Sequence, residues 1–322
     1  MRAIEARGLG VSFGDVKPLR GVDLAIDGPG IYGFLGVNGA GKTTTLRVLA
    51  GLLEPDHGEA FICGQPVGIR HVEPRRRVGW LPQHPSFPPW LRAREVLELA
   101  GELSGLGRRE ARGRAGELLE RLGLSDAAAR RVTGFSGGMR QRLGLAQALV
   151  GRPQVLLLDE PMSALDPIGR AEVADLLVEL SSATTVFYST HILDDVERVC
   201  ESVAVLHHGR ILLYEPTRRL LDRFRERTIE LRVLGDPAGL AVAVPAWAES
   251  IEVPSPSPDG GDGLPVWIRC RDPEAAARSL PGWLANAGLG LMDLGWVQPS
   301  LESVFLKLLE QDDAQHPPGG LP

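Results

Sequence analysis

Cysteine is scarce in this sequence, and its three cysteines, Cys63, Cys200 and Cys270, are far apart. This spacing predicts neither a disulfide framework nor a cysteine metal site, and it is typical of a reducing, cytoplasmic setting. No apolar run approaches the roughly 18 residues needed to cross a membrane. Residues 1–14 carry charges and no apolar core, so no signal peptide is expected. If the protein works at a membrane, another polypeptide must cross it.

An excess of positive charge is also missing. The chain of 322 residues has 35 lysines and arginines against 41 aspartates and glutamates, a formal net charge of -6. We therefore expect no nucleic-acid partner, because nucleic-acid-binding surfaces are basic. The content of 43% hydrophobic and 24% charged residues is ordinary for a soluble globular protein. The length suits one large domain with a small one, or two of medium size.

A glycine-rich stretch lies between an apolar run, Ile31 to Leu35, and a helical pattern that begins near Leu46. Its residues are Gly36, Val37, Asn38, Gly39, Ala40, Gly41, Lys42, Thr43 and Thr44. A G-x-x-x-x-G-K-T sequence between a strand and a helix is typical of a phosphate-binding loop. Its backbone N–H groups and the following helix N-terminus can face an anion. We expect Lys42 to reach the β- and γ-phosphates of a nucleotide, and the Thr43 hydroxyl to bind Mg²⁺.

A second apolar run, from Val155 to Leu158, ends in two adjacent carboxylates. The lack of alternation predicts a strand that is buried on both faces in a parallel sheet. Burying acids is costly, so Asp159 and Glu160 indicate a function rather than a packing role. We expect Asp159 to hold Mg²⁺ and Glu160 to orient and deprotonate a water molecule.

Four further residues have ordinary structural explanations when each is considered alone. They are Phe13 as a core or edge aromatic, Gln83 as a polar loop residue, Ser136 as a helix N-cap and His191 as a strand-end histidine. Ser136 is followed by two glycines and an amphipathic helix, so an exposed helix N-terminus that binds an anion is the alternative explanation.

Composition divides the chain into parts. Residues 86–150 are rich in Ala, Leu, Glu and Arg, with apolar residues at helical spacing, which predicts a helical insertion in an α/β domain. After about residue 217, alternating strand patterns and helical patterns predict a small α+β domain. The predicted division is an ATP-binding domain at 1–216, an accessory domain at 217–311 and a disordered tail at 312–322.

Taken together and in this order, the motifs resemble those of the ATP-binding subunit of an ABC transporter over residues 1–215. In family terms they are the Walker A loop Gly36–Thr44, the Q-loop glutamine Gln83, the signature Phe135–Met139, the Walker B strand Leu156–Glu160, the D-loop Ser163–Asp166 and the switch histidine His191. The signature reads Phe-Ser-Gly-Gly-Met where Leu-Ser-Gly-Gly-Gln is commonest, and Val37 stands where proline is frequent. No residue needed for hydrolysis is missing, so we expect an active site.

The resemblance implies a P-loop NTPase fold with an antiparallel β subdomain and a helical subdomain. It implies that Phe13 stacks on adenine, that His191 contacts the γ-phosphate and that Gln83 senses the metal and the water. Two copies of the chain would close head to tail around two ATP molecules, each bound by one copy and met by the other's signature. The residues that would serve nucleotide binding there are Ser136, Gly137, Gly138 and Asp166.

The resemblance also implies a partner, an integral-membrane permease, and a cytoplasmic location at the inner face of the cell membrane. The region after 217 resembles the C-terminal extension of bacterial exporters of drugs, antibiotics and sodium, most closely from Gln298 to Leu306. Export is therefore the expected direction of transport.

Three alternatives differ from this interpretation. DNA-repair ABC ATPases carry a long coiled coil between the two halves of the site, whereas about 90 residues separate Lys42 from Ser136. Ribosome-acting members usually have two ATPase domains. A P-loop kinase or GTPase would leave His191 and the Ser-Gly-Gly helix unexplained, and the Asn-Lys-x-Asp guanine motif is missing. A regulatory binder that does not hydrolyse ATP is disfavoured by the intact Glu160.

Overall fold

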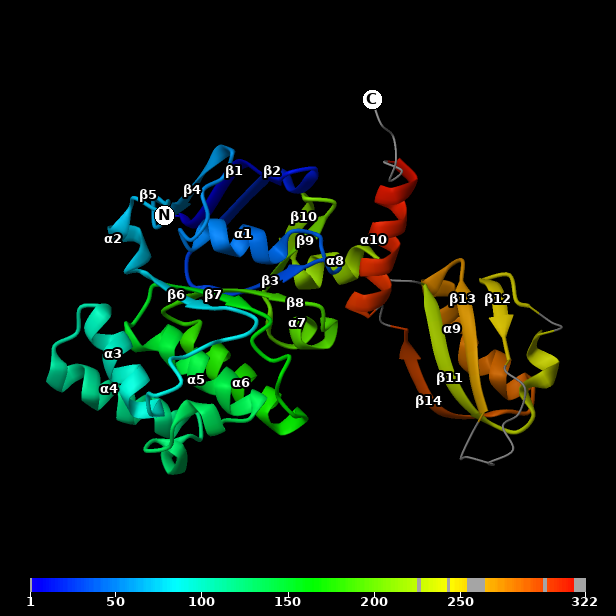
Figure 1. The fold of residues 1–322 in the computed structure, drawn as a ribbon. Helices are drawn as coiled ribbons and strands as arrows, with labels where there is room; N and C mark the ends of the chain where they lie inside the picture. Colours follow the sequence, from blue (N-terminus) through cyan, green and yellow to red (C-terminus); the bar gives the residue numbers. More distant parts are fainter. Residues whose placement is uncertain (1, 225–226, 242–243, 254–263, 298–299, 316–322) are drawn as a thin grey trace. The chain divides into compact units, whose positions relative to one another are not determined.

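A computed structural model describes residues 2–224, 227–241, 244–253, 264–297 and 300–315 of the chain. These residues form two compact units. One contains the chain up to Arg218 together with the residues from Lys307 onward, and the other contains Arg219–Leu306. Figure 1 shows the chain as a ribbon. Each unit has its own hydrophobic core.

The central element of the first unit is a six-stranded sheet in the order β10-β9-β3-β8-β7-β6. Its strands are β3 (Gly30–Leu35), β6 (Val78–Leu81), β7 (Val155–Asp159), β8 (Thr185–Thr190), β9 (Ser202–His207) and β10 (Arg210–Pro216). All pairs are parallel except that of β9 with β10. Every residue of β7 is buried, which confirms the prediction from its unbroken apolar run. The loops that follow β3, β7 and β8 meet at one edge of the sheet, because parallel strands end on the same side.

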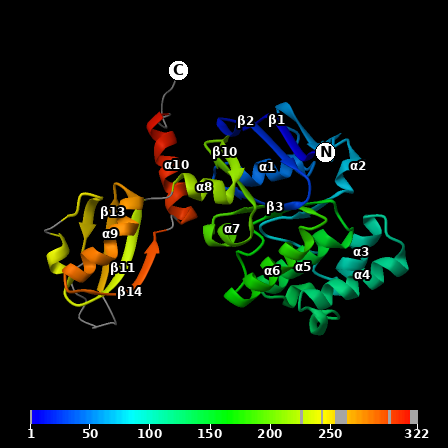
Figure 2. The same cartoon turned by 180° about the vertical axis from the view of Figure 1, so that it is seen from behind.

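Helices cover both faces of this sheet, with α1 (Lys42–Leu49) on one face and α5, α6 and α7 on the other (Figures 1 and 2). These three are α5 (Gly137–Val150), α6 (Pro167–Leu180) and α7 (Leu193–Val199). Leu46 and Leu49 of α1 are fully buried in one cluster with Phe34 of β3 and Phe187 of β8. This packing holds the start of α1 at the end of β3.

A second, antiparallel sheet of the first unit has the order β2-β1-β4-β5. Its strands are β1 (Arg2–Phe13), β2 (Val16–Asp27), β4 (His57–Ile62) and β5 (Gln65–Pro66). Their buried side chains, such as Ile4, Leu24 and Ile62, belong to the same cluster as those of α1. Helix α1 is therefore buried by contacts with both sheets.

Residues 86–150 contain the helices α3 (Ala93–Leu103), α4 (Arg108–Arg121) and α5, with 3₁₀ turns at Ser125–Ala127 and Val132–Gly134. A short helix, α2 (Val72–Arg75), precedes them. Arginine and glutamate side chains of α4 form surface ion pairs, for example Arg114 with Glu117 at 2.6 Å. Among the described residues, none of the helices combines the length and apolar character needed to cross a bilayer.

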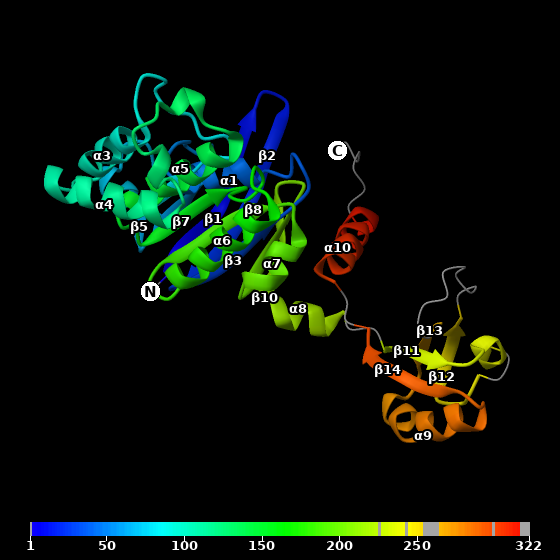
Figure 3. The same cartoon turned by 90° about the horizontal axis from the view of Figure 1, so that it is seen from below.

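The second unit is a small α+β domain with an antiparallel sheet in the order β12-β13-β11-β14 (Figure 3). Its elements are β11 (Thr228–Leu234), a 3₁₀ turn (Pro237–Ala241), β12 (Ala248–Glu252), β13 (Leu264–Cys270), α9 (Pro273–Asn286) and β14 (Gly290–Trp296). The side chains of β11 alternate between buried and exposed, and the buried ones pack with Leu280 and Leu284 of α9. Trp247 and Trp283 meet edge to face in the same cluster, with ring centroids 5.7 Å apart.

The end of the chain differs from the predicted disordered tail at 312–322. Helix α10 (Leu301–Gln315) continues through the first four of these residues, and residues 316–322 lie outside the described part. The accessory unit also ends earlier than expected, because α10 from Lys307 groups with the first unit. Helix α8 (Thr217–Arg223) spans the boundary predicted at 216. Of the exporter-like stretch, Gln298 and Pro299 lie outside the described residues.

Candidate functional site

The glycine-rich loop connects β3 to α1, as its sequence predicts. Gly41 has a φ of 112°, and a Cβ there would lie 2.4 Å from the carbonyl oxygen of Pro18. At Gly36 a Cβ would lie 2.6 Å from the carbonyl oxygen of Leu206. Side chains are therefore excluded at both ends of the loop, which lets its backbone turn tightly and begin α1.

Lys42 is buried, with 7% of its surface exposed, and its side chain bends back along the loop. Its Nζ donates hydrogen bonds to the carbonyl oxygens of Gly36 at 2.6 Å and Val37 at 3.2 Å. Burial lowers the pKa of Lys42, and the carboxylates of Glu160 and Asp159 act in the opposite direction. Burial is the larger of these effects, and the two acids partly offset it.

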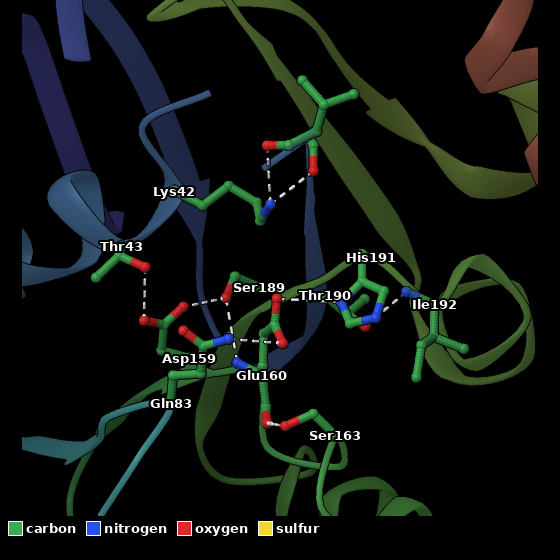
Figure 4. A network of polar contacts seen from close by, with 12 residues as sticks. Lys42, Thr43, Gln83, Asp159, Glu160, Ser163, Ser189, Thr190, His191 and Ile192 are labelled. Atoms are coloured by element: carbon green, nitrogen blue, oxygen red, sulfur yellow. Dashed lines mark hydrogen bonds and ion pairs between the residues drawn. The ribbon is translucent and has the colours of Figure 1, made fainter. Parts of the chain in front are cut away.

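Asp159 ends β7 with 2% of its surface exposed, and both carboxylate oxygens are hydrogen-bonded (Figure 4). Thr43 Oγ1 donates to Oδ2 at 2.8 Å, and Ser189 Oγ donates to Oδ1 at 2.5 Å. A hydroxyl and a carboxylate oxygen at this spacing form a donor set that suits Mg²⁺, which binds oxygen ligands. Thr43 and Asp159 therefore fit the metal site that the sequence predicted.

Glu160 is buried at 8% exposure and lies between two side chains from other loops. Gln83 Nε2 donates to its Oε2 at 3.0 Å, and His191 Nδ1 lies 3.1 Å from its Oε1 (Figure 4). Its backbone φ of 49° is in the left-handed region, which costs about 1–3 kcal/mol in a residue other than glycine. Such strain persists where the surroundings hold a residue in place, and it is common at functional sites.

The surroundings of the Glu160 backbone supply that restraint. Its N–H donates to the carbonyl oxygen of Ser189 at 3.0 Å, and to Ser189 Oγ at 3.2 Å. Its carbonyl oxygen accepts from Gln141 Nε2 at 3.2 Å and from Ser163 Oγ at 3.1 Å. The sequence analysis missed Ser189 and Gln141. Ser189 could have been found from its position near the end of a strand with an apolar start, which is where the other site residues lie. In the structure it pairs with Asp159 of the neighbouring strand.

Replacing Ser189 with alanine is expected to lower kcat for ATP hydrolysis by about tenfold or more with little change in KM. The hydroxyl bonds both Asp159 and the Glu160 backbone, and one hydrogen bond to a charged group contributes about 1.5–3 kcal/mol. Thr185→Ala is the matched control, because Thr185 is also buried on β8 and its hydroxyl bonds the distant carbonyl of Gly28 at 2.7 Å. Steady-state kinetics and thermal unfolding of both variants test this, and an equal loss of kcat in the control would contradict a positioning role.

Four residues of the signature and the D-loop line a pocket next to the Glu160 network. Ser136, Gly137, Gly138 and Asp166 line one open pocket of about 630 Å³. Ser136 Oγ accepts from the Met139 N–H at 3.2 Å and caps α5, and Asp166 caps α6 by accepting from Gly169 at 2.9 Å. In the described part of the chain, no hydrogen bond joins these residues to Lys42 or Asp159. Gly137 also lines a second pocket, of about 440 Å³, together with Gln83 and Glu160.

Phe13 lies at the end of β1 and is 55% exposed, outside the polar network of Figure 4. An exposed ring at a strand end has no packing role to explain it. One chain therefore brings together Lys42, Thr43, Gln83, Asp159, Glu160 and His191. Among the described residues, Phe13, Ser136 and Gly138 form no hydrogen bond or ion pair with this network.

Residues of this kind at the carboxyl edge of a parallel sheet are those of a P-loop nucleotide hydrolase, and this is the class to which the fold and the site assign the protein. Residues 19–163 match the model of the ABC transporter family. Daunorubicin resistance ATP-binding protein DrrA3 of Streptomyces coeruleorubidus is 35% identical in an alignment of 322 positions that covers 96% of this chain and 96% of the relative. The chain therefore belongs to the family of ABC transporter ATP-binding proteins.

Two other relatives are also named as ATP-binding proteins. Nod factor export ATP-binding protein I of Rhizobium sp. (strain N33) is 34% identical and matches over 95% of this chain and 96% of its own. An uncharacterised ABC transporter ATP-binding protein of Bacillus subtilis, YxlF, is 46% identical over 177 residues, but only 55% of this chain and 58% of YxlF are aligned.

Solved structures match about two thirds of the chain. The ATP-binding subunit of an ABC transporter has a TM-score of 0.64 and 29% identity, over 69% of this chain and 93% of that one. The ATP-binding cassette MJ0796, in a dimeric post-hydrolysis state with ADP and Pi, has a TM-score of 0.62 and 26% identity, over 67% and 99%. The predicted fold class and the prediction of an ATP-binding, ATP-hydrolysing ABC subunit are thus confirmed.

Proposed function

We propose that two copies of this chain bind two ATP molecules between them, and that hydrolysis drives export of a substrate through a separate membrane permease. The observation that carries the proposal is that Ser136, Gly138 and Asp166 line a pocket that does not include Gln83 or Glu160 of the same chain. An ATP site that uses both sets of residues is completed by a second chain. The dimeric state of the related cassette MJ0796 supports this arrangement.

In the proposed site, Lys42 and the loop amides bind the phosphates, Phe13 stacks on the adenine, and the partner's Ser136 and Gly138 complete the site at the γ-phosphate. Thr43 and Asp159, with Gln83 near them, would hold Mg²⁺, which would offset the phosphates' negative charge. Glu160 orients a water molecule and accepts its proton as the water oxygen bonds to the γ-phosphorus and the bond to the ADP oxygen breaks. Gln83 and His191 hold the two Glu160 oxygens, and His191 is 53% exposed and can also reach the nucleotide.

The permease is proposed to dock beside the helical subdomain, which places the protein at the inner face of the membrane. A groove of about 530 Å³ is lined by Trp80 of β6, Ala100 and Leu103 of α3, and Arg75 of α2. Leu103 is 77% exposed, which leaves apolar surface for a partner at this groove. Strand β6 leads from the groove to Gln83, so docking there can act on the residue that contacts Glu160.

Export is proposed as the direction because relatives that match nearly the whole chain are named for Nod factor export and daunorubicin resistance. Co-expression with a multi-span membrane protein encoded next to this chain tests the partner. ATP-dependent accumulation of substrate inside inverted membrane vesicles then tests the direction. Loss of substrate from such vesicles on adding ATP would contradict export.

Replacing Ser136 with arginine is expected to leave ATP binding to the monomer intact and to prevent dimer formation. The larger, positively charged side chain fills the pocket where the partner's ATP is proposed to lie. Ser125→Arg is the control, because Ser125 is also an exposed serine of the helical subdomain but does not line that pocket. Calorimetry measures ATP affinity and size-exclusion chromatography measures the dimer in a background that does not hydrolyse ATP. Normal dimerisation and turnover of Ser136→Arg would show that the second chain's signature is not used.

A further inference from the structure

Two adjacent histidines lie at the turn between β9 and β10, away from the network around Glu160. His208 and Gly209 both have left-handed backbones, with φ of 45° and 77°, the pattern of a two-residue type I′ hairpin turn. Neighbouring side chains of a regular strand point to opposite faces. Here the turn brings the two rings together, with centroids 3.9 Å apart.

Two aspartates of α10 contact these histidines from a position 105 residues further along the chain. Asp312 Oδ2 lies 2.8 Å from His207 Nδ1. Asp313 Oδ1 lies 3.1 Å from His208 Nε2 and 3.7 Å from His207 Nε2. All four residues belong to the first compact unit.

We propose that His207, His208 and Asp313 bind a divalent transition-metal ion of the Zn²⁺ type. One ligand atom from each of the three lies within 4.8 Å of the others. Ligand bonds of about 2.0–2.1 Å in a tetrahedral zinc site place neighbouring ligand atoms about 3.3 Å apart. The distances from Asp313 Oδ1 to the two Nε2 atoms, 3.1 and 3.7 Å, bracket this value.

Asp312 supports the same assignment. A carboxylate that accepts a hydrogen bond from Nδ1 leaves the lone pair of a neutral imidazole on Nε2, facing the metal, and this arrangement is common around zinc. His207 is 5% exposed and the Asp312 side chain 17%, so water competes little for the contact. Two imidazoles select Zn²⁺ over Mg²⁺ or Ca²⁺, which prefer oxygen ligands, and the two carboxylates balance the charge of the ion.

The bound ion would connect the end of α10 to the β9–β10 hairpin. Helix α10 begins in the accessory unit, and its residues from Lys307 belong to the first unit. Metal binding would thus stabilise the docked state of the helix that ends the described chain. Stabilisation of α10 by the metal would require neither ATP hydrolysis nor transport, so this proposal does not depend on the proposed function.

Zn²⁺ affinity of the full chain tests the site. The titration uses a competing chromophoric chelator and excess Mg²⁺, which occupies oxygen sites but competes poorly for imidazole. We expect one saturable site per chain in the unsubstituted protein. Loss of an outer-shell partner typically weakens metal sites by about 10–100-fold, so Asp312→Asn should do this and His208→Ala and Asp313→Asn should weaken binding at least as much. His71→Ala, at an exposed histidine outside the cluster, should bind as the unsubstituted protein does.

Hydrogen exchange gives a second readout that does not depend on catalysis. Zn²⁺ should slow amide exchange in the last two turns of α10 in the unsubstituted protein and in His71→Ala, but not in Asp313→Asn. The absence of saturable Zn²⁺ binding would overturn the proposal. Equal affinities in the unsubstituted protein, His208→Ala and Asp313→Asn would also overturn it, because the ion would then bind elsewhere.

Discussion

Replacing Glu160 with glutamine is expected to reduce ATP hydrolysis by about 10²–10⁴-fold and to leave ATP bound, because this is the range that a general base contributes. The amide keeps the size of the carboxylate and an acceptor oxygen for Gln83 or His191, but it cannot take a proton from water. If hydrolysis separates the two chains, blocking it should accumulate an ATP-bound dimer. Phosphate release measures the first effect, and size-exclusion chromatography with ATP and Mg²⁺ measures the second.

Glu73→Gln is a suitable control, since Glu73 is an exposed glutamate of α2 whose side chain contacts only Arg76, at 3.6 Å, among the interactions found in the described residues. It should hydrolyse ATP at the normal rate and show no additional dimer. Turnover of Glu160→Gln at the normal rate would remove Glu160 as the base. Loss of turnover without a dimer would agree with Glu160 as the general base, but it would contradict the proposed two-chain site.

Replacing Lys42 with alanine is expected to weaken ATP binding by at least about 100-fold. Losing one partner of a buried charge pair costs about 3–5 kcal/mol, and each 1.4 kcal/mol is a factor of ten in affinity. Lys42 is buried under the loop, so no exposed side chain can replace its charge. Isothermal titration calorimetry with ATP measures the change.

Arg47→Ala controls for the loss of a basic side chain from α1, because Arg47 is exposed at the other end of the same helix. It should bind ATP as the unsubstituted protein does. Circular dichroism checks that Lys42→Ala is folded. An unchanged ATP affinity in folded Lys42→Ala would contradict the assignment of the Gly36–Thr44 loop.

The position of the site residues at strand ends was predictable because the burial of a strand is visible in its local sequence pattern. An apolar run without alternation marks β7 as a buried strand, and the end of such a strand in a parallel sheet lies beside the ends of its neighbours. Lys42 follows β3, Asp159 ends β7 and His191 follows β8, three adjacent strands of the sheet. Only the structure shows that these strands are neighbours and that the three residues therefore meet.

Contacts between elements were not predictable in this way. Gln141 has the spacing of an ordinary helical residue, and only the packing of α5 under the Glu160 loop gives its amide a buried partner. Residues 312–315, which include Asp312, Asp313 and Gln315, follow the last apolar pattern and were expected to be disordered. They are helical, and Asp312 and Asp313 lie against His207 and His208, a contact that no local pattern reports.

By itself the sequence determined the phosphate loop, the acidic strand end and the family, because glycines, buried runs and adjacent acids constrain the backbone within a few residues of themselves. Tertiary structure alone decided which hydroxyl bonds Asp159, how Glu160 is held with a left-handed backbone, and where α10 ends. Those features depend on side chains brought together from distant segments, and their free energy comes from burial and hydrogen bonds that exist only once the core has packed.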